Sequence, residues 1–145
     1  MRVAMYKGTR PGLHGLYSRL TRWIDGGIYS HCELIFSDGV SSSASYIDGG
    51  VRFKDIYYDT EHWDFIEVPA FLELGARIWF RMHVNDKYDL WGNVRFAFGF
   101  ARESKNKWFC SEAVMAALGY TDAYRFGPNG MAALLSRLYV QGRIK

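Results

Sequence analysis

The sequence predicts an α+β fold, in which a small antiparallel β-sheet packs against helices. Short apolar or alternating runs fill the first half of the chain, and turns rich in glycine and aspartate separate them, as is typical of antiparallel strands. From Phe71 onward the apolar residues follow helical spacing instead. The chain has 145 residues, 49% of them hydrophobic, which is enough for one core. We therefore expect residues 1–145 to form a single domain.

Five strands are expected before residue 70. Each is a short run that is apolar on at least one face and that a turn follows. The turns at Asp38-Gly39 and Asp48-Gly49 are hairpin signals, so the strands on either side of them should pair antiparallel. The expected strands are 2–6, 31–36, 40–46, 51–56 and 63–68.

Five helices are expected from apolar spacing and from signals at their ends. Asp25-Gly26-Gly27 ends a helix that lies between the first two strands. Asp89 is a suitable N-cap for a later helix, and Gly119 suits the position just past the end of another. The expected helices are 16–24, 72–84, 89–101, 110–118 and 128–138.

Composition argues against several classes of function. The net charge is only +3 and the basic residues are scattered, so no nucleic-acid partner is expected. No apolar stretch has the length of a transmembrane helix, and the first residues lack the apolar core of a signal peptide. Two cysteines make no disulfide framework, and neither has a neighbour at metal-ligand spacing. We expect no metal, no cofactor, and a cytoplasmic or virion-associated protein.

Cys110 is the first candidate for chemistry. It is expected in the first turn of the helix over 110–118, where the helix dipole favours the thiolate. Backbone N–H groups of that turn, including that of Cys110, would point at the oxygen of an attacked carbonyl. Ser111 and Glu112 make the turn polar. On position alone, a small buried hydrophobe is an equally consistent interpretation of Cys110.

His31 is the candidate partner base, because it opens an otherwise apolar strand. Alternation divides this strand into two faces, His31, Glu33 and Ile35 on one and Cys32, Leu34 and Phe36 on the other. The second face is apolar, so Cys32 is expected to be an inert packing residue. The first face sets the Glu33 carboxylate where it could orient the imidazole and stabilise the imidazolium. A solvated residue or a partner for an arginine is an equally consistent interpretation of Glu33.

Two segments that lie far apart in the chain carry a resemblance to a known family. They are Ser30-His31-Cys32-Glu33-Leu34-Ile35-Phe36, followed by an aspartate–glycine turn and the Gly50-Val51 strand, and Trp108-Phe109-Cys110-Ser111-Glu112. Together they resemble the circularly permuted branch of the NlpC-type papain-like superfamily. That branch includes YiiX-like bacterial proteins and, more distantly, lecithin:retinol acyltransferase-like enzymes, and the chain is also similar to small phage or prophage relatives. The resemblance runs from Arg2 to about Leu118.

The resemblance implies a permuted papain-like fold and a role for each matching residue. Cys110 matches the nucleophile and His31 the general base. The family usually carries a third polar residue on the next strand, where this chain has Ser42 and Ser43 instead of a stronger acceptor. We expect Glu33 to orient His31, with a serine hydroxyl as the alternative. The resemblance also suggests two candidate substrate-binding residues, Tyr6 and Ser43, although an ordinary strand tyrosine is an alternative for Tyr6.

The expected function is that of a cysteine hydrolase acting on an amide bond in a cell-wall (peptidoglycan) peptide. His31 would take the thiol proton, Cys110 would attack the carbonyl, and water would release the acyl-enzyme. Two alternatives stay open. One is a lipid-directed thioesterase or acyltransferase of the same fold, which an apolar channel would favour over a polar groove. The other is a virion structural or binding domain without turnover, which the serines at positions 42 and 43 favour.

Overall fold

The structure is a computed structural model that describes residues 1–9, 11–90 and 106–140. Within these residues the protein is a mixed α+β structure, as expected, with a seven-stranded open sheet and four α-helices. The strands are β1 (Arg2–Tyr6), β2 (His31–Ile35), β3 (Ser41–Ser45), β4 (Gly50–Lys54), β5 (Trp63–Glu67), β6 (Lys87–Tyr88) and β7 (Lys107–Trp108). The helices are α1 (Leu13–Asp25), α2 (Glu73–His83), α4 (Cys110–Ala117) and α5 (Pro128–Leu135).

The sheet has the strand order β5-β1-β2-β3-β4-β6-β7. Its first five strands in chain order agree with the predicted runs, and neighbours among them pair antiparallel. The strands β6 and β7 are additional, and they pair parallel to each other. The sheet is therefore not purely antiparallel. Each additional strand is two residues long, too short for a periodic pattern in the sequence to reveal it.

The helices also agree with the predicted ranges, with two differences. Helix α1 begins at Leu13, three residues before the predicted start, and α5 ends at Leu135 before a turn of π-helix, η3 (Ser136–Val140). Short 3-10 turns, η1 (Ala70–Leu72) and η2 (Ala123–Arg125), precede α2 and α5. The predicted helix over 89–101 lies outside the described residues, apart from its first two.

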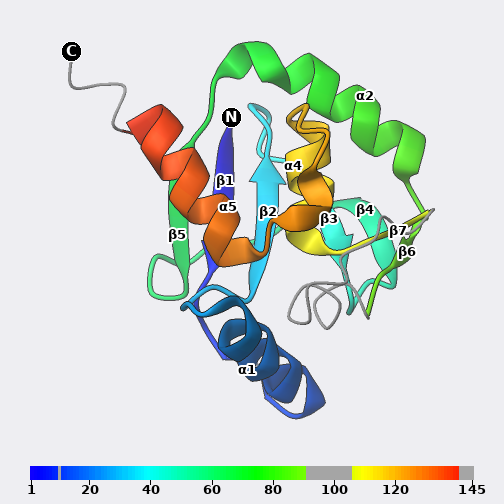
Figure 1. Cartoon of the computed structure of the whole chain (residues 1–145). Helices are drawn as coiled ribbons and strands as arrows, with labels where there is room; N and C mark the ends of the chain where they lie inside the picture. Colours follow the sequence, from blue (N-terminus) through cyan, green and yellow to red (C-terminus); the bar gives the residue numbers. More distant parts are fainter. Residues whose placement is uncertain (10, 91–105, 141–145) are drawn as a thin grey trace.

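One face of the sheet carries the main core. Figure 1 shows α2, α4 and α5 on this face, with α1 projecting from the lower end of the sheet. Cys32 and Leu34 of β2, and Phe36 just after it, point into this core, which also contains Cys110. The other face carries a smaller cluster of Ala4, Ile35 and Trp63. The predicted alternation along β2 is therefore confirmed. Within the described part of the chain, no helix is both long and apolar enough to cross a bilayer.

Strand β3 consists of small residues, which lets other elements approach it closely. Its sequence is Ser-Ser-Ser-Ala-Ser, and all five residues are buried. Helix α4 packs over β2 and β3, with Ala44 in the shared core. Because no bulky side chain intervenes, α4 packs closely against the sheet, and its first residues lie near β2, the strand that begins at His31.

The boundaries of α4 follow from its sequence. Phe109 is extended, with φ −99° and ψ 167°, and the helix begins at Cys110. Gly119 has a φ of 95°, a left-handed conformation that favours glycine, so the predicted end of this helix is confirmed. Cys110 is thus the first residue of a short helix that packs on β2 and β3.

Candidate active site

Cys110, His31 and Glu33 form a connected group at one end of β2. Cys110 opens α4 and His31 opens β2. The His31 ring is hydrogen-bonded to the Cys110 thiol and, through Nε2, to Glu33 Oε1 at 2.7 Å. Cys110 and Glu33 are buried, with 2% of Cys110 and 1% of the Glu33 side chain exposed. His31 is half-buried, with 13% of its side chain exposed.

Glu33 is a buried carboxylate with a second cationic partner. Arg52 of β4 donates from Nη1 and Nη2 to Glu33 Oε2 and Oε1, at 2.7 and 2.5 Å. Such a two-pronged contact fixes the plane of the carboxylate. Burial raises the pKa of Glu33, but the hydrogen bonds from Arg52 and His31 outweigh burial and hold that pKa below its usual value. His31 therefore faces an ionised and fixed acceptor.

Arg52 reaches Glu33 across a whole strand because the residue between them is small. Ser43 pairs with Arg52, and continuing the register in which Leu34 pairs with Ser42 puts Ser43 opposite Glu33. Residues opposite each other on antiparallel strands share a face, so Glu33, Ser43 and Arg52 form one row. The Ser43 hydroxyl donates to the carbonyl oxygen of Cys32 at 2.7 Å. Ser43 thus lies between Glu33 and Arg52 in this row, and its small side chain lets the two charged side chains meet.

The environment of His31 favours its protonated form. Burial lowers the pKa of the imidazole, but hydrogen bonds to Cys110 and Glu33 and the charges of both groups outweigh burial and raise the pKa to about 9. A group with this pKa holds its proton at pH 7. At neutral pH His31 is therefore an imidazolium beside Cys110.

The Cys110 thiol is acidic in the same environment. Hydrogen bonding to the Cys32 side chain is the strongest influence; with that to His31 it overcomes burial and lowers the pKa of Cys110 well below its ordinary value. Burial raises the pKa of Cys32 well above its ordinary value, so the Cys32 thiol keeps its proton and donates. Cys32 lies on the apolar face of β2, as expected. It nevertheless touches Cys110, so the expectation that it is merely inert packing is incomplete.

The first turn of α4 is polar yet buried. Ser111 donates to the carbonyl oxygen of Phe126 at 2.7 Å, and Glu112 accepts the backbone N–H of Phe109 at 3.4 Å. These two side chains fasten the start of the helix. Because the first N–H groups of a helix have no partner within it, those of Cys110 and Ser111 lie at its open end. An anionic oxygen near the Cys110 sulfur would meet them there.

The other predicted site residues lie around this group. Tyr6 pairs with His31 across β1 and β2, and both line one small cavity, so a role for Tyr6 in binding substrate stays a prediction. Ser42 donates to the carbonyl oxygen of Arg52 at 2.8 Å. Ser42 and Ser43 are fully buried, and both hydroxyls are committed to backbone carbonyls. Neither the alternative role of orienting His31 nor substrate binding by Ser43 gains support from these contacts.

An asparagine far along the chain holds the backbone just before His31. Asn129 Oδ1 accepts the N–H of Tyr29 at 2.9 Å, and Nδ2 donates to the Tyr29 carbonyl at 3.0 Å and to Asp25 at 2.7 Å. A Cβ on Gly27 would lie 2.2 Å from Asn129 Oδ1, so only glycine fits there. These hydrogen bonds connect the last residue of α1, the residues just before β2 and the first turn of α5, and they thereby fix the backbone next to His31.

Two cavities border the group. The smaller, of about 30 Å³, lies beside His31 and Ser30 and has room for about one water molecule. Tyr17 and Tyr88, whose hydroxyls are hydrogen-bonded at 2.9 Å, also line it. The larger, of about 270 Å³, is lined by polar and aromatic side chains that include Glu33, Asp48, Arg52, Lys54, Asp55 and Trp63. Ser45 and Ile47 line both cavities, which therefore adjoin.

No protein-family model matches the chain, and no curated protein matches it. The chain is an α+β protein in which a helix-initial cysteine, a histidine and a glutamate are connected by hydrogen bonds.

Proposed function

We propose that the chain is a cysteine hydrolase with a permuted papain-like fold of the NlpC type. Cys110 is its nucleophile, His31 its general base and acid, and Glu33 the residue that orients His31. The observation that carries the proposal is the hydrogen-bonded order Cys110–His31–Glu33, with the cysteine at the start of a helix. A lowered thiol pKa and a raised imidazole pKa are what such a nucleophile and its partner need.

The chemistry proceeds in two stages. The Cys110 thiolate attacks an amide carbonyl carbon, and the N–H groups at the start of α4 stabilise the resulting oxyanion. His31 gives the proton that came from the thiol to the leaving nitrogen, so an amine departs and an acyl thioester remains. A water molecule then attacks the thioester and gives a proton to His31. The carboxylic acid leaves, and the thiolate–imidazolium pair is restored.

The order of the elements supports the permuted fold. The histidine strand β2 lies early in the chain and the nucleophile helix α4 late, and α4 packs on β2 and β3. The orienting carboxylate comes from the histidine's own strand, and Arg52 of β4 holds it. This chain would thereby replace the family's acceptor on the following strand with a glutamate–arginine pair.

The character of the larger cavity favours an amide substrate over a lipid. Charged side chains from β2, β4 and the connecting loops line it, among them Asp48, Lys54 and Asp55. A polar groove suits a peptide with its own charges and amide groups, and an acyl chain would leave these charges desolvated. We infer a peptide substrate, and a cell-wall peptide is the one that the sequence resemblance suggests.

The proposal is tested by trapping the acyl-enzyme. Purified protein is incubated with an activated thioester and, separately, with peptides released from peptidoglycan, then quenched in acid and measured by intact-protein mass spectrometry. We expect one added acyl group, mapped to Cys110, and release of amine from the cell-wall peptides. Cys110→Ala should abolish both signals.

The matched control is Cys32→Ser, which keeps a hydrogen-bond donor beside Cys110 and should keep the acylation. If neither substrate acylates the protein although Cys110 reacts with iodoacetamide, the idle virion or binding domain becomes the better account. Acylation by long-chain thioesters alone would favour the lipid-directed alternative.

A further inference from the structure

Helix α1 turns its large apolar side chains toward solvent. Leu16, Leu20 and Trp23 lie along one side of the helix, and 64%, 42% and 82% of these residues are exposed. Ile28, just beyond the helix, extends the same apolar patch in sequence and is also exposed. Figure 1 shows α1 projecting from the end of the sheet that is opposite α2. We call Leu16, Leu20, Trp23 and Ile28 the α1 patch.

The opposite side of α1 is the buried one, and it is small and polar. Gly15, Ser18 and Thr21 are buried, and at 3.6 residues per turn they lie on the side of the helix away from the α1 patch. Thr21 donates to the carbonyl oxygen of Tyr17 at 3.0 Å. An amphipathic helix ordinarily buries its apolar side, so this orientation leaves apolar surface for another phase or molecule.

The charged residue beside the α1 patch is an arginine. Arg19 borders the α1 patch and is exposed. Arg22 lies on the other side of the helix, half-buried, and donates to the carbonyl oxygens of residues 7 and 8 and to the Thr9 hydroxyl. Asp25 is the one acidic residue of the helix, and Asn129 engages its carboxylate. Among the described residues, the arginines in ion pairs are Arg52 and Arg77.

We propose that α1 docks on an anionic lipid surface. The leucines and Trp23 would enter the boundary between headgroups and acyl chains, and Arg19, which is exposed beside them, would face the lipid phosphates. A helix with tryptophan and leucine on one side and arginine beside them has the composition of helices that lie in a membrane interface. Trp23 is the side chain best suited to that depth, because its ring is apolar and its N–H is polar.

The charges favour lipid over a second copy of the chain. Two molecules meeting symmetrically through the α1 patch would bring Arg19 of one toward Arg19 of the other, which is unfavourable. An anionic surface has the complementary charge. The inference does not rest on the proposed hydrolase, although Tyr17 and Ser18 of α1 line the cavity beside His31 and docking would hold that cavity near the lipid.

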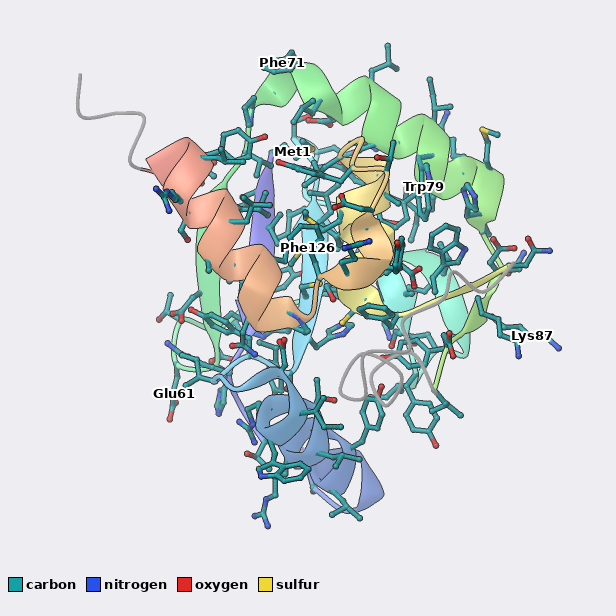
Figure 2. The ribbon with its side chains drawn as sticks, viewed as in Figure 1. Met1, Glu61, Phe71, Trp79, Lys87 and Phe126 are labelled. Carbon is teal, nitrogen blue, oxygen red and sulfur yellow. The ribbon has the colours of Figure 1, made fainter. Side chains whose placement is uncertain are left out.

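Helix α2 supplies a comparison within the same molecule. Phe71, Leu74, Ile78 and Met82 form a second exposed apolar stripe on its outer side, and Figure 2 shows Phe71 pointing outward. Here charges of both signs flank the stripe: Arg77 contacts Glu73 at 3.0 Å and Asp38 at 2.7 Å, and Arg81 is exposed. Variants of this stripe therefore test exposed apolar side chains that have acidic as well as basic neighbours.

The test is sedimentation of the full chain with vesicles, either pure phosphatidylcholine or equal parts phosphatidylcholine and phosphatidylglycerol. We expect binding to the anionic vesicles that weakens with salt. Leu20→Gln with Trp23→Gln should lower the partition coefficient by about tenfold or more, because two buried apolar side chains are lost. Arg19→Gln should lower it by about fivefold, and only on the anionic vesicles.

The control is Leu74→Gln with Ile78→Gln on α2, which should bind as the wild type does. Far-UV circular dichroism and thermal melting verify that each variant is folded, as expected for exposed positions. Absence of binding by the wild-type chain would overturn the proposal. So would an equal loss in the α2 variant, or a dimer in sedimentation velocity that Leu20→Gln with Trp23→Gln dissociates.

Discussion

Glu33 and His31 lie two residues apart on one strand, yet Oε1 of the first and Nε2 of the second are 2.7 Å apart. Side chains two apart on a strand stand side by side on one face, an arrangement that does not by itself turn a carboxylate toward a ring. Arg52 supplies the missing constraint, since it binds both carboxylate oxygens from β4. The histidine is thus oriented from its own strand.

Glu33→Gln should cost far more activity than Ser43→Ala. The glutamine keeps the shape but loses the charge that stabilises the imidazolium, so we expect kcat/KM to fall by about a hundredfold or more. Ser43→Ala removes a hydrogen bond to a backbone carbonyl and leaves the contact between His31 and Glu33 in place. Steady-state kinetics on one amide or thioester substrate compare the two. A larger loss of activity in Ser43→Ala than in Glu33→Gln would instead assign the orientation of His31 to the serine on β3.

Arg52→Met should destabilise the fold by about 3–5 kcal/mol, because it leaves Glu33 buried without its main cationic partner. Lys54→Met is the matched control on the same strand. Its side chain is 48% exposed and pairs with Asp48, so we expect a change within about 0.5 kcal/mol. Urea unfolding measures both.

The pH dependence of this stabilisation has a definite sign. Folding lowers the pKa of Glu33 from 4.5, so its ion pair stabilises the fold above that pH. The stabilisation is lost as the pH falls through the lower folded-state pKa. The difference between wild type and Arg52→Met should therefore shrink in acid, and a difference that grew in acid would contradict the role given to Glu33.

Cys32→Ala should raise the pKa of Cys110 toward its ordinary value. The Cys32 thiol is the first cause of the lowered pKa of Cys110, and alanine cannot donate. Cys32→Ser keeps a donor and should behave more like the wild type. The pH dependence of thiolate absorbance in the ultraviolet reports the change. Equal titration curves for the alanine variant and the wild type would show that Cys32 does not lower the pKa of Cys110 and serves only as a packing residue.

Activity should depend on pH at both limits. The competent form has Cys110 ionised and His31 protonated. Lowering the pH protonates the thiolate, and the lowered pKa of Cys110 moves this limit below that of an ordinary thiol. Raising the pH removes the imidazolium proton, with a limit near 9. The profile of kcat/KM should therefore be bell-shaped. A single rise through the pH range of an ordinary thiol would argue against the pair.

Local patterns predict the elements of this fold well. The alternation His31, Glu33, Ile35 assigned the faces of β2 correctly, and Gly119 marked the end of α4 correctly. The strands β6 and β7 escaped prediction because two residues have no period, and because their parallel pairing joins distant parts of the chain.

The candidate site is only partly predictable from the sequence, because its supporting residues depend on strand register and on contacts across the chain. Alternation can place Arg52 on one face of β4, but only the register through Ser43 brings it to Glu33. Asn129 reaches Tyr29 across about a hundred residues of chain, and no local signal marks that contact. The contact between Cys32 and Cys110 likewise depends on how α4 packs on β2.

The measurement that tests the central claim most directly is the rate of alkylation of each cysteine as a function of pH. The folded protein is treated with limiting iodoacetamide, digested and mapped. If Cys110 is a thiolate paired with protonated His31, it should react first, at pH values well below the ordinary pKa of a thiol, while Cys32 stays unmodified. His31→Gln should move the reactivity of Cys110 to higher pH. Preferential modification of Cys32, or a Cys110 that becomes reactive only as an ordinary thiol does and is indifferent to His31→Gln, would contradict the account.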